Sequence, residues 1–87
     1  MKTLDQLKRL QTAIIKSIDS RNSKIKDKEL ALAIENRLLE MGFIENSTVT
    51  ILHAGFGGYP LAVRINNYNT MLSLRKLEAS LIEVEEI

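Results

Sequence analysis

The chain has 87 residues, a length that suits one small domain and is too short for two. Hydrophobic residues make up 45% of it and charged residues 26%, as in an ordinary globular protein, and the absence of cysteine excludes disulfides, thiolate zinc sites and cysteine nucleophiles. No apolar run reaches the roughly 18 residues of a membrane span, and the charged N-terminus is unlike a signal peptide, so we expect a cytoplasmic domain without membrane insertion.

The formal net charge of +1 is unevenly distributed. Residues 2–28 carry eight lysines and arginines against three aspartates, whereas residues 29–87 carry four against eight glutamates. One interpretation is a basic patch for an acidic partner or a nucleic acid. The other is a solvated connecting loop, which the polar stretch SRNSKIKDK favours, because blocks of like charge are commonly solvated.

The N-terminal segment predicts a short helical turn followed by a strand. TLDQL has the capping-box pattern of Thr3 and Gln6, which suits one turn of helix. QTAIIKSI, residues 11–18, reads as a strand with Ala13 and Ile15 facing inward, although its other isoleucines fall on the opposite face.

The clearest helix is predicted over residues 27–41. Asp27 can cap its start, and Gly42 can end it in the left-handed conformation, which places Phe43 against Leu38 across a Schellman turn. The apolar stripe that should face the core consists of Leu30, Ile34, Leu38 and Met41.

The remaining segments alternate like strands, with turns between them. Strands are predicted at 47–53, 60–66, 70–74 and 81–87, with a turn at 66–69 and a short helix at 75–80. The fold is therefore mainly β, a small closed barrel of five mostly antiparallel strands with one helix inserted between strands 1 and 2. A single domain is expected to span residues 3–85.

The stretch HAGFGGYPLAV holds three of the four glycines, the only proline and the only histidine. It lacks the lysine and the following helix of a phosphate-binding loop, and His53 alone is a weak metal ligand, so we predict a strand-end histidine and a connecting loop at 55–60. Phe56 and Tyr59 either cover the open end of the barrel or point outward to contact a partner.

Catalysis is not indicated by the sequence. One histidine, scattered serines and no cysteine do not form a nucleophilic triad. The carboxylates of the C-terminal run, Glu83, Glu85 and Glu86, suggest solubilising charge rather than acid–base chemistry. We therefore predict no enzyme, no cofactor and no metal site.

Several motifs resemble the ferrous iron transport protein A family, small cytosolic bacterial proteins with an SH3-like barrel. They are the opening TLDQLK, the helix end RLLEMGF, the loop and strand AGFGGYPLAVRI, and the closing segment LSLRKLEASLIEV. The chain departs from the family where it has Arg9-Leu10, Glu45-Asn46 and Asn67 in place of segments that usually contain glycine.

The resemblance implies a non-catalytic accessory that regulates bacterial ferrous iron uptake by contact with the membrane iron transporter, which carries a cytosolic GTP-binding domain. The predicted contact surface consists of Phe56, Gly57, Gly58, Tyr59 and Pro60, helped by Arg37 or by the basic loop of residues 21–28. Three alternatives stay open: a barrel related to the C-terminal domain of iron-dependent repressors, a small barrel that binds nucleic acid, and a direct iron binder. The nucleic-acid alternative is disfavoured because the cations and the loop aromatics lie in separate segments.

Overall fold

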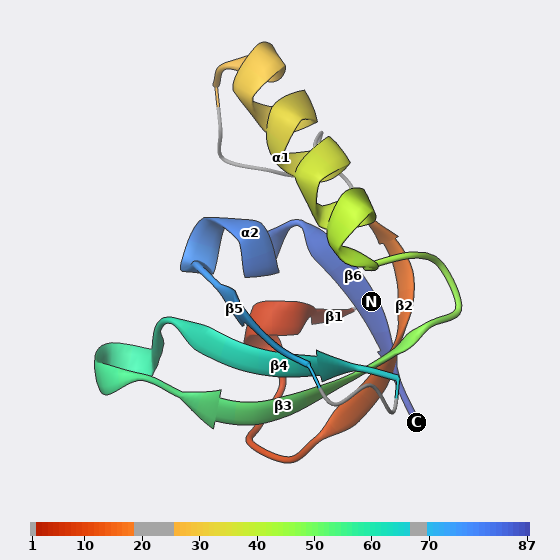
Figure 1. Ribbon diagram of the computed structural model, residues 1–87, viewed down its shortest axis with the longest axis vertical. Coiled ribbons are helices and arrows are strands. Elements are labelled where there is room, and N and C mark those ends of the chain that lie inside the picture. The colour runs from red at the N-terminus through yellow and green to blue at the C-terminus, as the bar shows by residue number, and fades with distance from the viewer. Residues whose placement is uncertain (1, 19–25, 67–69) are drawn as a thin grey trace.

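The computed structural model describes residues 2–18, 26–66 and 70–87. Its strands form one antiparallel sheet in the order β1-β6-β2-β3-β4-β5, which curls around a single core (Figure 1). Along the chain the elements are β1 (Lys2–Thr3), η1 (Leu4–Gln6), β2 (Thr12–Ile18), α1 (Lys28–Met41), β3 (Thr48–Ala54), η3 (Phe56–Gly58), β4 (Leu61–Ile65), β5 (Met71–Leu74), α2 (Lys76–Ser80) and β6 (Ile82–Glu86).

The sheet has six strands where the sequence predicted five. The additional strand, β1, is only two residues long and pairs Lys2 with Val84 and Thr3 with Glu83 of β6. A pair of residues carries no alternating pattern, so only its partner strand reveals it. The predicted turn after it is confirmed as η1, in which the backbone N–H of Thr3 donates to Gln6 Oε1 at 3.0 Å.

The two edge strands of the sheet, β1 and β5, are not hydrogen-bonded to each other. Among the pairings of the described residues, β1 and β5 are each bonded on one side only. The short helix η1 follows β1 directly, α2 follows β5, and these two helices pack against each other. Their contact covers the place where the hydrogen-bonded ladder stops, in keeping with the protection that edge strands need.

Two bulges bend the strands. The register of β2 against β6 shifts between Ile15 and Ser17, and that of β3 against β4 shifts between Ile51 and His53. A bulge reverses the side-chain alternation beyond it and increases the local twist. This explains why Ile18, which the alternation assigned to the outer face, packs against the core.

The core is filled by aliphatic side chains from the inner face of the strands and by Phe43. Ala13 and Ile15, the predicted inward positions of β2, are buried, as is Leu38, the helix residue predicted to meet Phe43. The largest side chains with less than 2% exposure are Phe43, Leu4, Ile15, Leu38, Ile51, Leu74, Leu81, Ile82, Val49, Val63 and Val84.

Helix α1 begins and ends as the sequence predicts. The carboxylate of Asp27 accepts from the N–H groups of Glu29 and Leu30 at 3.0 and 3.2 Å. Gly42 has φ +106°, and the N–H of Phe43 donates to the Leu38 carbonyl at 3.1 Å, which is the Schellman bond. The chain therefore turns sharply and brings Phe43 into the core.

The predicted apolar stripe of α1 is only partly covered. Leu38 is fully buried, and Ile34 and Met41 pack against the core, but Leu30 is 49% exposed, so its assignment to the core is wrong. Figure 1 gives the reason, because the C-terminal end of α1 lies over the sheet while its N-terminal end projects beyond it. Within the described ranges, no helix has both the length and the apolar character to span a bilayer.

Candidate functional site

The predicted contact loop forms a compact turn between β3 and β4. Its two ends are tied together because the N–H of Gly55 donates to the Pro60 carbonyl at 2.9 Å, and the N–H of Gly58 donates to the Gly55 carbonyl at 2.8 Å. Between these bonds Phe56–Gly58 make the single turn η3. The loop lies at the far end of the β3–β4 hairpin, away from α1 (Figure 1). The loop is therefore a defined projection at the end of a bulged hairpin.

The glycines of the loop have different roles. Gly57 and Gly58 adopt φ of +76° and +95°, and a Cβ at either would meet no atom within 4 Å, so their backbone faces open space. A Cβ on Gly55 would lie 2.7 Å from the Tyr59 carbonyl oxygen, so this glycine is required by close packing. The loop thus presents bare backbone to solvent at its tip and closes tightly at its base.

The two loop aromatics were predicted either to cover the barrel or to face a partner. Tyr59 is half-buried and packs against the core, which makes it a cover for the barrel, whereas Pro60 beside it is exposed. Burial raises the pKa of the Tyr59 hydroxyl, and the negative charge of Asp5 adds to this effect. The side chain of Phe56 lies outside the described part of the chain.

Arg37 lies on α1, apart from the loop. Its Nη1 is 3.7 Å from Oε2 of Glu78, while 69% of its side chain is exposed. Glu78 is nearly buried and also caps α2 by accepting from the N–H of Arg75 at 2.8 Å. Among the described residues, no hydrogen bond or ion pair joins Arg37 to the η3 loop, so the structure does not bring the predicted contact residues into one cluster.

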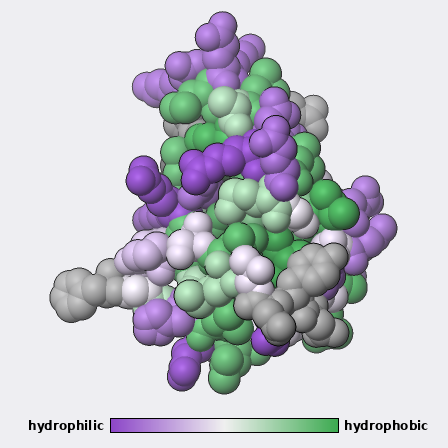
Figure 2. All heavy atoms as spheres, viewed as in Figure 1, coloured by the Kyte–Doolittle hydropathy of each residue, from purple (hydrophilic) through white to green (hydrophobic). Residues whose placement is uncertain are grey.

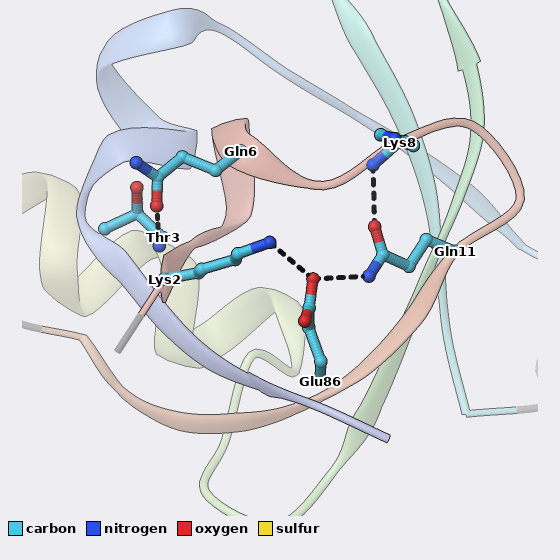
Figure 3. Close-up of polar contacts among 6 residues, drawn as sticks. All are labelled: Lys2, Thr3, Gln6, Lys8, Gln11 and Glu86. Atoms are coloured by element: carbon cyan, nitrogen blue, oxygen red, sulfur yellow. Dashed lines mark hydrogen bonds and ion pairs between the residues drawn. The ribbon is translucent and has the colours of Figure 1, made fainter.

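A cleft that the sequence did not predict lies where the two ends of the chain meet. It measures about 400 Å³. Its lining residues are Lys2, Gln6, Lys8, Arg9, Leu10, Gln11 and Glu86, which we call the basic cleft. Figure 3 shows how its polar side chains converge: Oε1 of Glu86 accepts from Lys2 Nζ at 2.6 Å and from Gln11 Nε2 at 2.7 Å.

The signal for this cleft was in the charge distribution. Cations were concentrated in the first 28 residues and carboxylates at the C-terminus. We interpreted the C-terminal carboxylates as solubilising, but two of them are paired in the structure, Glu86 with Lys2 and Glu85 with Lys16 at 2.9 Å. The two hydrogen bonds from Lys2 and Gln11 hold the pKa of Glu86 below its usual range.

The described part of the chain has no site that could hold a metal ion through several side chains. No group of three or more histidine or carboxylate side chains comes together there. His53 lies near the end of β3, exposed, opposite Ala62 of β4. A single imidazole on a strand end offers one ligand at most, far from the four of a structural zinc site.

Comparison with known proteins gives a family and a fold. A family model described as the FeoA domain matches residues 2–86. A search of curated protein sequences gives no match. In the crystal structure of Stenotrophomonas maltophilia FeoA complexed with zinc, the protein is 29% identical with a TM-score of 0.76, over 98% of this chain and 91% of that one. It is described as a prokaryotic SH3 domain protein, suggested to act as a bacterial ferrous iron transport activating factor.

Two further solved structures are similar. Iron(II) transport protein A from Clostridium thermocellum is 28% identical with a TM-score of 0.74, over 99% of this chain and 46% of that one. A manganese-dependent transcriptional repressor in complex with manganese is 14% identical with a TM-score of 0.71, over 99% of this chain and 36% of that one. The second likeness concerns the fold alone.

These comparisons confirm the SH3-like barrel and the resemblance that the sequence motifs indicated. The barrel has one more strand than predicted, and its inserted helix lies between β2 and β3. Since the family model matches nearly every residue, the chain belongs to the FeoA family.

Proposed function

We propose that this protein is a non-catalytic cytosolic accessory of bacterial ferrous iron uptake, which acts by contact with the GTP-binding domain of the membrane iron transporter. The observation that carries the proposal is the FeoA family match over residues 2–86. The description of the S. maltophilia relative as a suggested transport activating factor supports the same role. Small SH3-like barrels present loops from a rigid sheet, an arrangement suited to protein contact.

The contact surface that we propose is the η3 loop with Tyr59 and Pro60, assisted by Arg37. Support comes from the open space around the backbone at Gly57, which allows a partner main chain to approach closely. Pro60 is exposed beside it, and the hairpin holds the loop in place. Among the described residues, the exposed guanidinium of Arg37 makes a single long ion pair, and it is available for a carboxylate of the partner.

The experiment is a titration of the ¹⁵N-labelled protein with the soluble GTP-binding domain of the transporter, with and without nucleotide. We expect amide shifts concentrated at residues 55–60 and around Arg37. Absence of shifts under both conditions, together with failure to bind the full-length transporter, would contradict the proposal. Shifts confined to another face would retain the function and reject this surface.

Two matched glycine variants sharpen the test. Gly57→Asn and Gly42→Asn both place asparagine at positive φ, which asparagine tolerates better than other residues. At Gly57 the new side chain projects into open space on the proposed surface, whereas at Gly42 it meets Ile65 Cδ1 at an ordinary 3.5 Å. Both proteins should fold, but only Gly57→Asn should weaken binding, by about ten-fold or about 1.4 kcal/mol.

A further inference from the structure

The basic cleft is separate from the η3 loop, and it contains a carboxylate group of the protein itself. Glu86 of β6 places its carboxylate between Lys2 of β1 and Gln11, which precedes β2 (Figure 3). Gln11 is itself fixed, because its Oε1 accepts from the N–H of Lys8 at 2.9 Å. The cleft therefore already binds one carboxylate, through the charge of Lys2 and the oriented side-chain amide of Gln11. A carboxylate of a ligand can be bound by the same kinds of group.

The cations of the cleft exceed this one carboxylate. Lys2 is paired with Glu86, whereas neither Lys8 nor Arg9 forms a close ion pair among the described residues, and Lys8 acts on Glu86 only through its charge at longer range. The only bond of the Arg9 side chain found there runs from Nε to the Leu52 carbonyl at 3.4 Å, which leaves its terminal nitrogens free for a ligand. The cleft thus carries a surplus of two positive charges beside a filled carboxylate site.

An apolar side chain stands next to these cations. Leu10 is 64% exposed and has φ +66°, and its N–H donates to the Ile51 carbonyl at 2.6 Å. The turn thereby keeps the Leu10 side chain exposed to solvent beside the charged residues of the cleft. An exposed leucine beside unpaired cations matches a segment that alternates acidic and apolar residues.

We propose that the basic cleft binds an acidic, leucine-containing peptide segment of a protein partner, whose carboxylates pair with Lys8 and Arg9 and whose apolar side chain packs on Leu10. This site would be a second contact surface, in addition to the η3 loop. The inference rests on the proposed accessory role only because it takes the partner to be a protein. A nucleic acid fits less well, because none of the residues that line the cleft is aromatic, so no base can stack there.

The test uses the whole chain, ¹⁵N-labelled, and a synthetic probe. The probe is an acetylated and amidated peptide of alternating glutamate and leucine, and the control peptide has glutamine at each glutamate. We expect the acidic peptide to shift the amides of residues 8–11 and of Glu86, to weaken as salt is raised, and to leave residues 55–60 unchanged. Equal binding of the glutamine peptide would overturn the proposal.

Charge variants provide the controls. Lys8→Gln with Arg9→Gln should weaken peptide binding about five-fold, because two exposed ion pairs are lost and each contributes modestly. The matched double variant Lys26→Gln with Lys28→Gln removes the same charge from exposed positions outside the cleft and should bind as the parent does. Equal losses in the two double variants would reduce the effect to net charge and contradict a built site.

Glu86→Gln gives the result that most clearly separates a ligand site from a structural ion pair. Glutamine keeps a hydrogen-bonding side chain in place but removes the internal negative charge, so the acidic peptide should bind about three-fold more tightly. An unchanged or weaker affinity would contradict the inference that the Glu86 carboxylate competes with the carboxylates of the peptide. Tighter binding of a single-stranded oligonucleotide of equal charge, or saturation by inorganic phosphate alone, would overturn the choice of a peptide. The transporter is absent from this assay. A negative result with the peptide therefore does not bear on the titration that tests the η3 loop.

Discussion

At the scale of single residues, the turn before β2 stores conformational strain. Leu10 adopts φ +66°, a region that L side chains with a Cβ occupy at a cost of about 1–2 kcal/mol. Within residues 2–18, 26–66 and 70–87, the other non-glycine residues at positive φ are Asn46 and Asn66, and asparagine tolerates this region well. Related proteins were expected to have glycine at this turn, so the structure gives the physical meaning of the departure at Leu10.

Leu10→Gly is therefore expected to raise the free energy of unfolding by about 0.5 kcal/mol, the relief of strain less the larger entropy of glycine in the unfolded chain. Urea denaturation measures the difference. Arg9→Gly is the matched control, because Arg9 has ordinary negative φ, and it should lower stability by about 0.5–1 kcal/mol. Destabilisation of similar size in both variants would show that no strain resides at Leu10.

The hydroxyl of Tyr59 makes stability depend on alkaline pH. Since burial and Asp5 raise its pKa in the folded state, the folded protein binds this proton more tightly than the unfolded chain does. The resulting stabilisation is complete below the unfolded pKa of about 10 and is lost as pH rises through the folded pKa. Tyr59→Phe keeps the ring and removes the titration.

We expect the difference in urea midpoint between the parent and Tyr59→Phe to shift in favour of the variant as pH passes about 10. The second tyrosine is present in both proteins, so its titration cancels. Parallel decline of both midpoints would mean that Tyr59 does not differ between the folded and unfolded states.

At the scale of elements, the two ends of α1 differ in how firmly they are held. Leu38 is fully buried in the core, whereas Leu32, almost two turns earlier, is 52% exposed. Figure 2 shows hydrophobic spheres exposed among hydrophilic ones over this helix. The helix is thus anchored by its C-terminal half and by the Gly42 turn that carries Phe43 inward.

Leu38→Ala should lower the free energy of unfolding by about 3 kcal/mol, through lost burial and the cavity left behind. Leu32→Ala makes the same chemical change at an exposed position and should alter it by less than about 0.5 kcal/mol. Thermal unfolding followed by circular dichroism compares the two. Similar losses would show that the exposed half of α1 is covered in solution.

The sequence predicted elements best where a local signal sets a boundary. Asp27, Gly42 and the alternation of β3 and β6 each act within a few residues, and the structure confirms them. The failures are non-local. The strand β1 exists only through its pairing with β6, Leu30 was misassigned because periodicity does not show how far a helix overhangs the sheet, and the basic cleft forms only when residues 84 positions apart meet.

The candidate site was predictable in the same measure. The sequence marked the η3 loop because glycine and proline are local signals, and the structure places Gly57 and Pro60 at the surface, while their role in contact stays a prediction. It did not anticipate that Gly55 is fixed by the Tyr59 carbonyl or that Arg37 bonds Glu78 on a different element. Which residues share a surface is decided by the curl of the sheet, to which the bulges near Lys16 and Leu52 contribute.

At the scale of the whole molecule, one core holds the sheet together, while part of α1 extends beyond it (Figure 1). β2 lies between β6 and β3, and β6 lies between β1 and β2, so both are paired on two sides. Amides of β2 and β6 should therefore exchange with solvent only through global unfolding, and amides in the first two turns of α1 through local opening.

Native-state hydrogen exchange at increasing urea measures this gradient. We expect the exchange free energies of β2 and β6 to equal the global value from equilibrium denaturation and to fall with urea at the same slope. The first turns of α1 should show smaller values with little urea dependence, because a local opening exposes little surface. If instead the strands separate into two groups with distinct slopes, residues 3–85 do not unfold as one cooperative unit, and the single domain expected from the sequence is wrong.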